Sequence, residues 1–225
     1  MEVQIFLRAG IRAESDGSAD FPVCGNADRR GNAQSILDRG EDGAKMQIEL
    51  WINEKKVKGE IEPDEILLDF LRKQGMTSVK RGCETSNCGL CTVFMDEKPV
   101  LSCSILAARA AGRRITTLEG LQKEAEEFGA FIADQGAEQC GFCNPGLMMN
   151  AIAMFREYCG ENFTKVSEKG SGEFSAEGSK DWKIPSEEQI KEYLAGNLCR
   201  CSGYEGQMRG IMAYLAYKKE KGASG

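Results

Sequence analysis

The ten residues GCETSNCGLC, numbered 82–91, hold three cysteines within the length of one tight loop. Cys83 and Cys88 have four residues between them, and Cys91 follows after two more. A further cysteine, Cys103, comes after eleven intervening residues. Thiols so close in sequence are typical of a metal site or a redox centre in a reducing compartment. The fold around this stretch is therefore expected to bring four sulfur atoms together.

The spacing C-x4-C-x2-C with a distant fourth cysteine is the pattern of a plant-type [2Fe–2S] site. A loop can wrap three thiolates around two irons, and the end of a neighbouring strand can bring the fourth. Gly82 and Gly89 let the backbone approach the cluster because they carry no Cβ. We expect Asn87 to adopt a left-handed backbone here. Lys80 and Arg81 precede the loop and supply either a positive field or solvated surface charges.

A second set of four cysteines lies nearer the end of the chain. Cys140 and Cys143 form a C-x2-C in QCGFCNPG, and Cys199 and Cys201 form a C-x-C in NLCRCSGY. Pro145 indicates a helix that begins beside the first pair, and its positive end suits an anionic cluster. The predicted ligands are Cys83, Cys88, Cys91 and Cys103 for one [2Fe–2S] cluster and Cys140, Cys143, Cys199 and Cys201 for the other.

Zinc is an alternative occupant of each set. Four-cysteine zinc sites usually combine two C-x2–4-C pairs, whereas this chain has a three-cysteine loop and a C-x-C. The other two cysteines are expected to be a bystander, Cys24, and a small apolar filler at a helix end, Cys159. The chain contains no histidine, which excludes Cys/His zinc fingers, Rieske clusters, His-ligated haem and Ser-His or Cys-His catalytic pairs.

The composition also limits the partners and the location. The 225 residues carry a net charge of −6, so a nucleic-acid partner has no electrostatic support. No apolar run reaches the length of a membrane span, and the apolar patch near the start is too short for a signal peptide. We therefore expect a cytoplasmic protein with no membrane span and no nucleic-acid partner.

The sequence pattern divides the chain into parts. Met46 opens a more regular pattern than the residues before it and is a candidate for the true translation start. The segment PDEILLDFLRKQG predicts a helix with Asp64 as its N-cap and Gly75 at its end, and two hairpins are expected, one turning near Asp96–Lys98. The predicted parts are a loose extension (1–45), a mixed α+β domain (46–118), a helical domain (119–219) with a flexible insertion at about 160–185, and a tail (220–225). Helices of the second domain are expected near 121–135, 145–158, 186–196 and 204–219.

Five motifs together resemble the iron–sulfur subunit of the molybdenum hydroxylases, over residues 46 to about 218. They are GCETSNCGLCTV, KPVLSC, ITTLEGL, QCGFCNPG and GNLCRCSGY, in the order of that family. The family includes xanthine dehydrogenases, aldehyde oxidoreductases, molybdenum-type carbon monoxide dehydrogenases, and nicotinate and hydroxybenzoyl-CoA enzymes. The resemblance implies an α+β fold, in which a plant-ferredoxin-like β-grasp domain precedes an all-α helical bundle domain that holds its own [2Fe–2S] cluster.

The resemblance also implies a role without substrate binding. The chain would relay electrons from molybdopterin on a large subunit, through both clusters, to FAD on another subunit. The cluster of the helical domain would lie on the molybdenum side, and the ferredoxin-like one on the flavin side. Gln139 matches the glutamine that hydrogen-bonds the pterin, and Cys201 matches the ligand closest to it. The stretches ETSN and GLCTV are similar to those of purine or xanthine dehydrogenases.

This chain departs from the family pattern in places. The family loop commonly carries glycines where this chain has ETSN (84–87), and threonine is frequent at the positions of Asn144 and Ser202. We expect altered hydrogen bonds near the pterin side. Two other functions stay open: a stand-alone two-cluster ferredoxin-like electron carrier and a zinc-stabilised interaction module.

Overall fold

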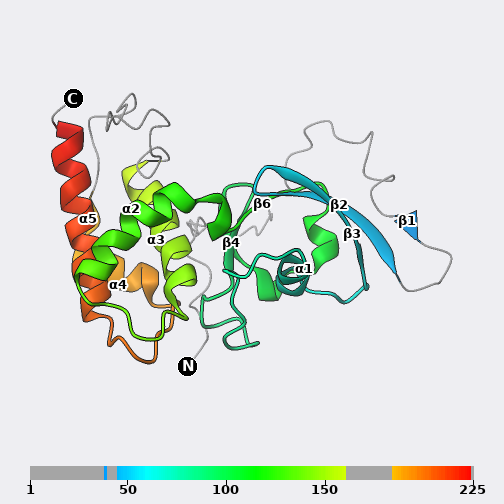
Figure 1. The fold of residues 1–225 in the computed structure, drawn as a ribbon, viewed down its shortest axis with the longest axis horizontal. Helices are drawn as coiled ribbons and strands as arrows, with labels where there is room; N and C mark the ends of the chain where they lie inside the picture. Colours follow the sequence, from blue (N-terminus) through cyan, green and yellow to red (C-terminus); the bar gives the residue numbers. More distant parts are fainter. Residues whose placement is uncertain (1–37, 40–44, 161–183, 224–225) are drawn as a thin grey trace, which may run out of the picture.

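The structure, a computed structural model, describes residues 38–39, 45–160 and 184–223. A mixed sheet with one helix precedes four longer or amphipathic helices, and the two parts meet where β4 lies beside α3 (Figure 1). Most of the predicted extension, Cys24, and nearly all of the predicted insertion lie outside the described residues. Within that extension, β1 (Asp38–Arg39) pairs with β2 in antiparallel register.

The sheet follows the order β1-β2-β6-β4-β5, and β3 pairs with β2. Strand β2 is antiparallel to β3 and parallel to β6, while β6 is antiparallel to β4. Alternate residues of β2, namely Ile48, Leu50 and Ile52, are buried because successive side chains point to opposite faces of a strand. The strands are β2 (Met46–Ile52), β3 (Lys55–Ile61), β4 (Thr92–Met95), β5 (Lys98–Leu101) and β6 (Arg114–Thr116).

Both predicted hairpins are confirmed, with two-residue turns. Asn53 and Glu54 join β2 to β3, and Asp96 and Glu97 join β4 to β5. All four residues have positive φ, between 49° and 65°. Two consecutive left-handed residues give the turn that matches the twist of antiparallel strands. The second hairpin places Cys103 just beyond β5, in the short 3-10 helix Ser102–Ser104.

Helix α1 (Leu67–Lys73) packs four apolar side chains into the core of the sheet. The prediction that Asp64 caps this helix is wrong: the N-cap is Ile66, without a side-chain hydrogen bond. Ile66 is extended and forms a bridge with Leu106, which delays the first helical turn. Gly75, with a φ of 86°, follows the last turn as predicted, because glycine accepts the left-handed end of a helix at little cost.

The four helices predicted for the second part are confirmed within a few residues at each end. Cys159 is buried at the end of α3, as expected of an apolar filler. The rings of Phe128, Phe155 and Tyr214 contact one another in edge-to-face or tilted pairs in the core between α2, α3 and α5, with centroids 5.2 or 5.3 Å apart. The helices are α2 (Gln122–Asp134), α3 (Asn144–Cys159), α4 (Glu187–Leu194) and α5 (Glu205–Ala223).

A small, separate hydrophobic core joins the sheet to the helices. Phe94 of β4 is fully buried against α3, where Met149 and Ile152 contact it. Arg156 of α3 lies over the Phe94 ring, with its guanidinium carbon 4.9 Å from the ring centre. The same side chain pairs with Glu97 of the second hairpin turn at 3.0 Å. These contacts hold the two parts, and the cysteines that each part carries, in a fixed relative position.

Candidate iron–sulfur sites

The first four predicted cysteines are brought together by the loop and the end of β5. The thiol of Cys83 is in hydrogen-bond contact with that of Cys88, and Cys91 with Cys103. Cys88 and Cys103 are close enough to interact electrostatically, which closes the set. The hydroxyl of Ser102 donates to the carbonyl of Cys91 at 2.8 Å and so ties the strand end to the loop.

Backbone N–H groups converge on one sulfur of this set. Burial raises the pKa of Cys83, but hydrogen bonds from the backbone of Asn87 and Thr85 outweigh it and lower the pKa to about 6. The amide nitrogen of Thr85 lies 3.5 Å from the Cys83 sulfur. Cys91 differs, because burial dominates there and raises its pKa to about 12. The loop therefore has the donors that a thiolate ligand of an anionic cluster needs.

The backbone of ETSN differs from the prediction. Asn87 is not in the left-handed region; Glu84, with a φ of 57°, and Ser86, with a φ of 62°, take that conformation. These two residues turn the N–H groups of Thr85 and Asn87 toward the sulfur of Cys83. Asn87 was predicted to be left-handed because asparagine tolerates that conformation well. In the structure, the direction of the Thr85 and Asn87 amides determines which residues are left-handed.

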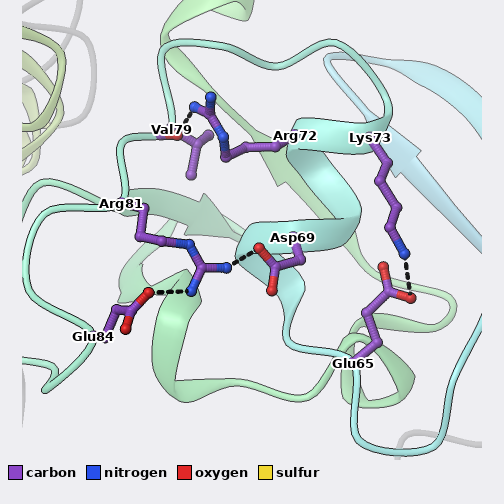
Figure 2. A network of polar contacts seen from close by, with 7 residues as sticks. All are labelled: Glu65, Asp69, Arg72, Lys73, Val79, Arg81 and Glu84. Atoms are coloured by element: carbon purple, nitrogen blue, oxygen red, sulfur yellow. Dashed lines mark hydrogen bonds and ion pairs between the residues drawn. The ribbon is translucent and has the colours of Figure 1, made fainter.

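Helix α1 holds the segment that enters the loop. Arg72 donates to the carbonyl of Val79 at 2.8 Å, and Arg81 pairs with Asp69 of the same helix (Figure 2). Arg81 also pairs with Glu84 inside the loop, at 2.9 Å. Two carboxylates thus balance this guanidinium, so Arg81 positions the loop. Arg81 is also exposed, which agrees with the solvated surface charge, one of the two alternatives from the sequence.

The second four cysteines also meet in one place. The sulfur of Cys201 lies 3.7 Å from that of Cys140 and 3.8 Å from that of Cys199. Cys143 is in hydrogen-bond contact with Cys199 and is the N-cap of α3, one residue earlier than the position that Pro145 indicated. Burial raises the pKa of Cys143 to about 12. The set therefore combines a buried thiol at a helix end with the half-buried C-x-C.

Two residues that support this set were not predicted. The Tyr204 hydroxyl donates to the Cys199 carbonyl and accepts from the Cys199 amide, each at 2.9 Å. Gln207 of α5, which is only 3% exposed, donates its side-chain amide to the Cys143 sulfur at 3.6 Å. Tyr204 stands in the motif GNLCRCSGY, which could have suggested a structural role. Gln207 has no local signal, since its role depends on how α5 packs.

The sulfur of Cys199 receives donors from Ser202. Burial raises the pKa of Cys199, but the hydroxyl and the amide of Ser202 outweigh it and lower the pKa to about 6. The Ser202 amide nitrogen lies 3.3 Å from that sulfur. Asn144, at the other position where the family often has threonine, donates to Glu138 at 2.6 Å. Both residues thus have local hydrogen-bonding roles around the second set.

One rim of the second set is open. Gln139 and Cys140 are exposed, and the amide of Gln139 donates to the carbonyl of Cys201 at 3.0 Å. Phe142, Leu198 and Tyr204 lie within three positions of a cysteine of this set in the sequence, and each is 45% exposed. An exposed group of apolar side chains is typical of a surface that a partner covers. We call these three residues and Gln139 the open rim.

The two sets touch one another. The Leu198 amide donates to the carbonyl of Cys88 at 2.9 Å. Cys88, Leu90 and Cys143 form a buried group against which Cys83 and Cys199 pack. The space between the two sets of sulfur atoms is thus filled by protein.

Glycines permit this close approach. A Cβ on Gly82 would lie 2.9 Å from the Cys88 sulfur, so the predicted role of Gly82 beside the ligands fits. Gly89 has a φ of 70°, and its Cβ would lie 2.5 Å from the carbonyl oxygen of Gly196. The missing side chain of Gly89 thus makes room for the second cysteine loop, a contact that was not predicted.

The donor sets fit [2Fe–2S] clusters. Each set offers four thiols joined by successive contacts, and cysteine thiolates are the usual ligands of such clusters. In such a cluster the four thiolates are spread over two irons.

Comparison with known proteins agrees with this chemistry. Residues 51–125 match the family described as 2Fe-2S iron-sulfur cluster binding domain, and residues 117–212 match the [2Fe-2S] binding domain family. A probable xanthine dehydrogenase subunit of Bacillus subtilis (strain 168) is 36% identical over 168 residues, which cover 73% of this chain and 83% of that protein. The xanthine dehydrogenase iron-sulfur-binding subunit of Escherichia coli O157:H7 is 39% identical over 162 residues, 71% of this chain and 88% of that protein.

A solved structure shows the same relationship. Quinoline 2-oxidoreductase from Pseudomonas putida 86 has a chain that is 32% identical, with a TM-score of 0.63. The similarity covers 79% of this chain and 98% of that one. Two family matches, two small-subunit relatives and one structure thus agree with the motifs and with the two sets of thiols. The chain therefore belongs to the iron–sulfur small subunits of the molybdenum hydroxylases and is an electron-transfer subunit of an oxidoreductase, with two [2Fe–2S] clusters as its cofactors.

Proposed function

We propose that the eight cysteines of the two sets are the cluster ligands and that the chain relays electrons from molybdopterin on a large subunit to FAD on another subunit. The observation that carries this proposal is the direct contact between the two sets, through the Leu198–Cys88 hydrogen bond and the buried group around Leu90. The ligands are Cys83, Cys88, Cys91 and Cys103 for the first cluster and Cys140, Cys143, Cys199 and Cys201 for the second.

The residues of this chain would perform three tasks in the relay. A [2Fe–2S] cluster, when bound, accepts and returns one electron. The loop amides near Cys83 and the Ser202 amide near Cys199 stabilise negative charge on the sulfurs. Leu90 is 6% exposed and excludes water between the sets. The hydrogen bond from Leu198 to Cys88 shortens the path that an electron takes through the protein from one set to the other.

We propose that the open rim docks the large subunit. Its apolar side chains are suited to burial, and Gln139 with Cys201 lies at the same edge, where the predicted contact with the pterin would form. The first set would then face the flavin subunit. The names of the two bacterial relatives, both belonging to xanthine dehydrogenases, support a purine as the substrate of the whole complex.

The fold and location complete the proposal. We infer a plant-ferredoxin-like β-grasp domain at 46–118 and a helical bundle domain at 119–219, which the order of strands and helices supports. None of the helices in the described ranges is long and apolar enough to cross a membrane. A cytoplasmic location remains part of the proposal.

Electron paramagnetic resonance of the reduced full chain tests the ligand assignment. Cys140→Ser should remove one of two signals and Cys103→Ser the other, because each residue belongs to a different set. Cys159→Ser is the matched control, since this buried thiol lies in neither set, and it should keep both signals. Loss of both signals from either ligand variant would contradict two independent sites.

Purification from the native host tests the assembly. The relay predicts that the chain co-purifies with molybdenum and flavin in stoichiometric amounts. A coloured chain that runs alone would favour the stand-alone carrier, and a colourless chain that contains zinc would favour the interaction module.

A further inference from the structure

Two serine hydroxyls from different segments meet at one sulfur of the first set. The Ser104 hydroxyl donates to the Ser86 oxygen at 2.6 Å. The Ser86 oxygen lies 3.6 Å from the Cys103 sulfur, and the Ser104 oxygen lies 3.8 Å from it. Ser86 comes from the cysteine loop, and Ser104 follows Cys103 at the end of β5.

The hydrogen atoms of this group can be assigned by counting donors. A serine hydroxyl has one hydrogen to donate and can accept two hydrogen bonds. Ser104 uses its hydrogen on Ser86, so the hydrogen of Ser86 remains available. A cysteine that ligates iron is a thiolate and can only accept. The hydroxyl of Ser86 is therefore the donor to Cys103, and Ser104 strengthens it by polarising the Ser86 oxygen.

The backbone of Ser86 has a conformation that is unfavourable for a residue with a side chain. Its φ of 62° lies in the left-handed region, which a residue with a Cβ adopts less readily than glycine. A glycine at this position would relieve the backbone and lose the donor. ETSN, which differs from the glycines common in the family, thus supplies a hydrogen bond to a sulfur.

The site opens to the outside. Ser86 and Ser104 line an open groove of about 930 Å³ between the sheet and α4, together with Asn150 and Tyr193. Cys103 is half-buried beside it. This edge of the first set is therefore accessible, and the same groove also reaches Gly89 and Gly196, where the two cysteine loops meet. Substitution of the two serine hydroxyls should leave the Leu198–Cys88 hydrogen bond in place, because that bond joins backbone atoms.

We propose that Ser86 and Ser104 are positioning residues that raise the reduction potential of the first cluster by donating a hydrogen bond to the Cys103 sulfur. Reduction adds negative charge, which a donor to a ligand sulfur stabilises, so the potential rises. Electrons that arrive from the second cluster would then collect on the first, next to the proposed flavin side. This inference rests on the proposed assignment of Cys103 as a ligand.

A redox titration of the full chain with both clusters, followed by electron paramagnetic resonance, tests this role. Ser86→Ala should lower the potential of the first cluster, with a roughly tenfold decrease in the equilibrium constant for one-electron reduction, which is about 59 mV. The second cluster should keep its potential. Ser104→Ala should give a smaller decrease, because the Ser86 donor remains.

Ser86→Gly separates the hydroxyl from the backbone. Glycine relieves the positive φ but also lacks the donor, so its potential should match that of Ser86→Ala even if the alanine variant folds poorly. Electron–nuclear double resonance in heavy water should show one exchangeable proton fewer near the first cluster in either Ser86 variant than in the wild type, because the backbone amide protons near Cys83 remain in all three proteins. Equal potentials in the wild type and Ser86→Gly, with both signals present, would overturn the proposal and leave the relay untouched. A wild-type chain without iron would contradict both.

Discussion

The amide of Leu198 donates to the carbonyl of Cys88 at 2.9 Å, so a residue next to the C-x-C hydrogen-bonds to a cysteine more than a hundred positions earlier in the chain. This contact depends on the close approach of two loops and one helix. Gly146, in the first turn of α3, has no room for a side chain, since a Cβ there would lie 2.7 Å from the Cα of Leu90. Backbone cannot move aside as a flexible side chain can.

Gly146→Ala should therefore separate the two sets. We expect a loss of about 1–3 kcal/mol in the free energy of unfolding, as for other overpacked cores, and a weaker magnetic coupling between the reduced clusters. Denaturant unfolding and electron paramagnetic resonance measure the two effects. Gly129→Ala is the matched helical control, because its Cβ would meet only the flexible end of Met148. Equal stability and coupling in both variants would show that this spacing is not critical.

Tyr204→Phe should loosen the C-x-C turn. The hydroxyl serves both the amide and the carbonyl of Cys199, and unpaired backbone groups cost about 1–3 kcal/mol when they are shielded from water. We expect the second cluster to be lost faster to an iron chelator, while the first is lost at the wild-type rate. Tyr217→Phe, on helix α5, packs against the core of the helices and not against either set, and it should behave as the wild type. Equal loss of both clusters would argue for a general effect on stability.

Gln207→Leu should lower the reduction potential of the second cluster. The buried amide donates to the Cys143 sulfur, and its removal takes away a donor that favours the reduced state. Leucine fills a similar volume, so the helix packing should persist. In a redox titration, the first cluster should keep its potential, which is the opposite selectivity to that expected for Ser86→Ala. An unchanged second potential would indicate that Gln207 only packs.

Glu119 should make the stability of the chain depend on pH. Burial raises the pKa of Glu119, but hydrogen bonds from Ser78 and Thr117 outweigh it and lower the pKa below the usual value of 4.5. A carboxyl whose pKa is lowered by folding stabilises the protein above its unfolded pKa, and this stabilisation is lost as the pH falls through the folded pKa. Glu119→Gln should therefore melt about 2–4 °C below the wild type at pH 7.

The difference in melting temperature between the wild type and Glu119→Gln should shrink on acidification below pH 4.5. There the unfolded wild type takes up a proton on Glu119, whereas the folded protein does so only at a lower pH. Thermal melts of both proteins at pH 7 and at a pH below 4.5 measure this difference. A difference that is the same at both pH values would mean that the hydrogen bonds matter and the charge does not.

Local spacing predicted much of this molecule. The two cysteine sets, both hairpin turns and the four later helices follow from patterns within short windows of sequence. The predicted N-cap of α1 was wrong because a long-range bridge between Ile66 and Leu106 determines where the helix begins. The contact of Gly89 with Gly196 could not be predicted for the same reason, since the second cysteine loop approaches Gly89 from far along the chain.

Hydrogen bonds to the sulfurs were the hardest features to predict. Asn87 has the side chain that best tolerates a left-handed backbone, yet Glu84 and Ser86 adopt it because of where the neighbouring amides must point. Gln207 donates to Cys143 from another helix, and the two residues are too far apart in the sequence for a local pattern to reveal this contact. The grouping of the cysteines into two sets could thus be predicted from local spacing, whereas the hydrogen bonds to their sulfurs depend on the folded chain.

The small core around Phe94 and the backbone contact at Gly89 have a kinetic consequence. Since β4 packs on α3 and the two loops touch through backbone atoms, the two sets of cysteines are held together without a hinge in the described part of the chain. Electron passage from one half to the other would then involve no domain rotation and no diffusion. Its rate should be the same in buffer and in concentrated glycerol, and solvent viscosity should affect only the encounter with whatever donates or takes the electron.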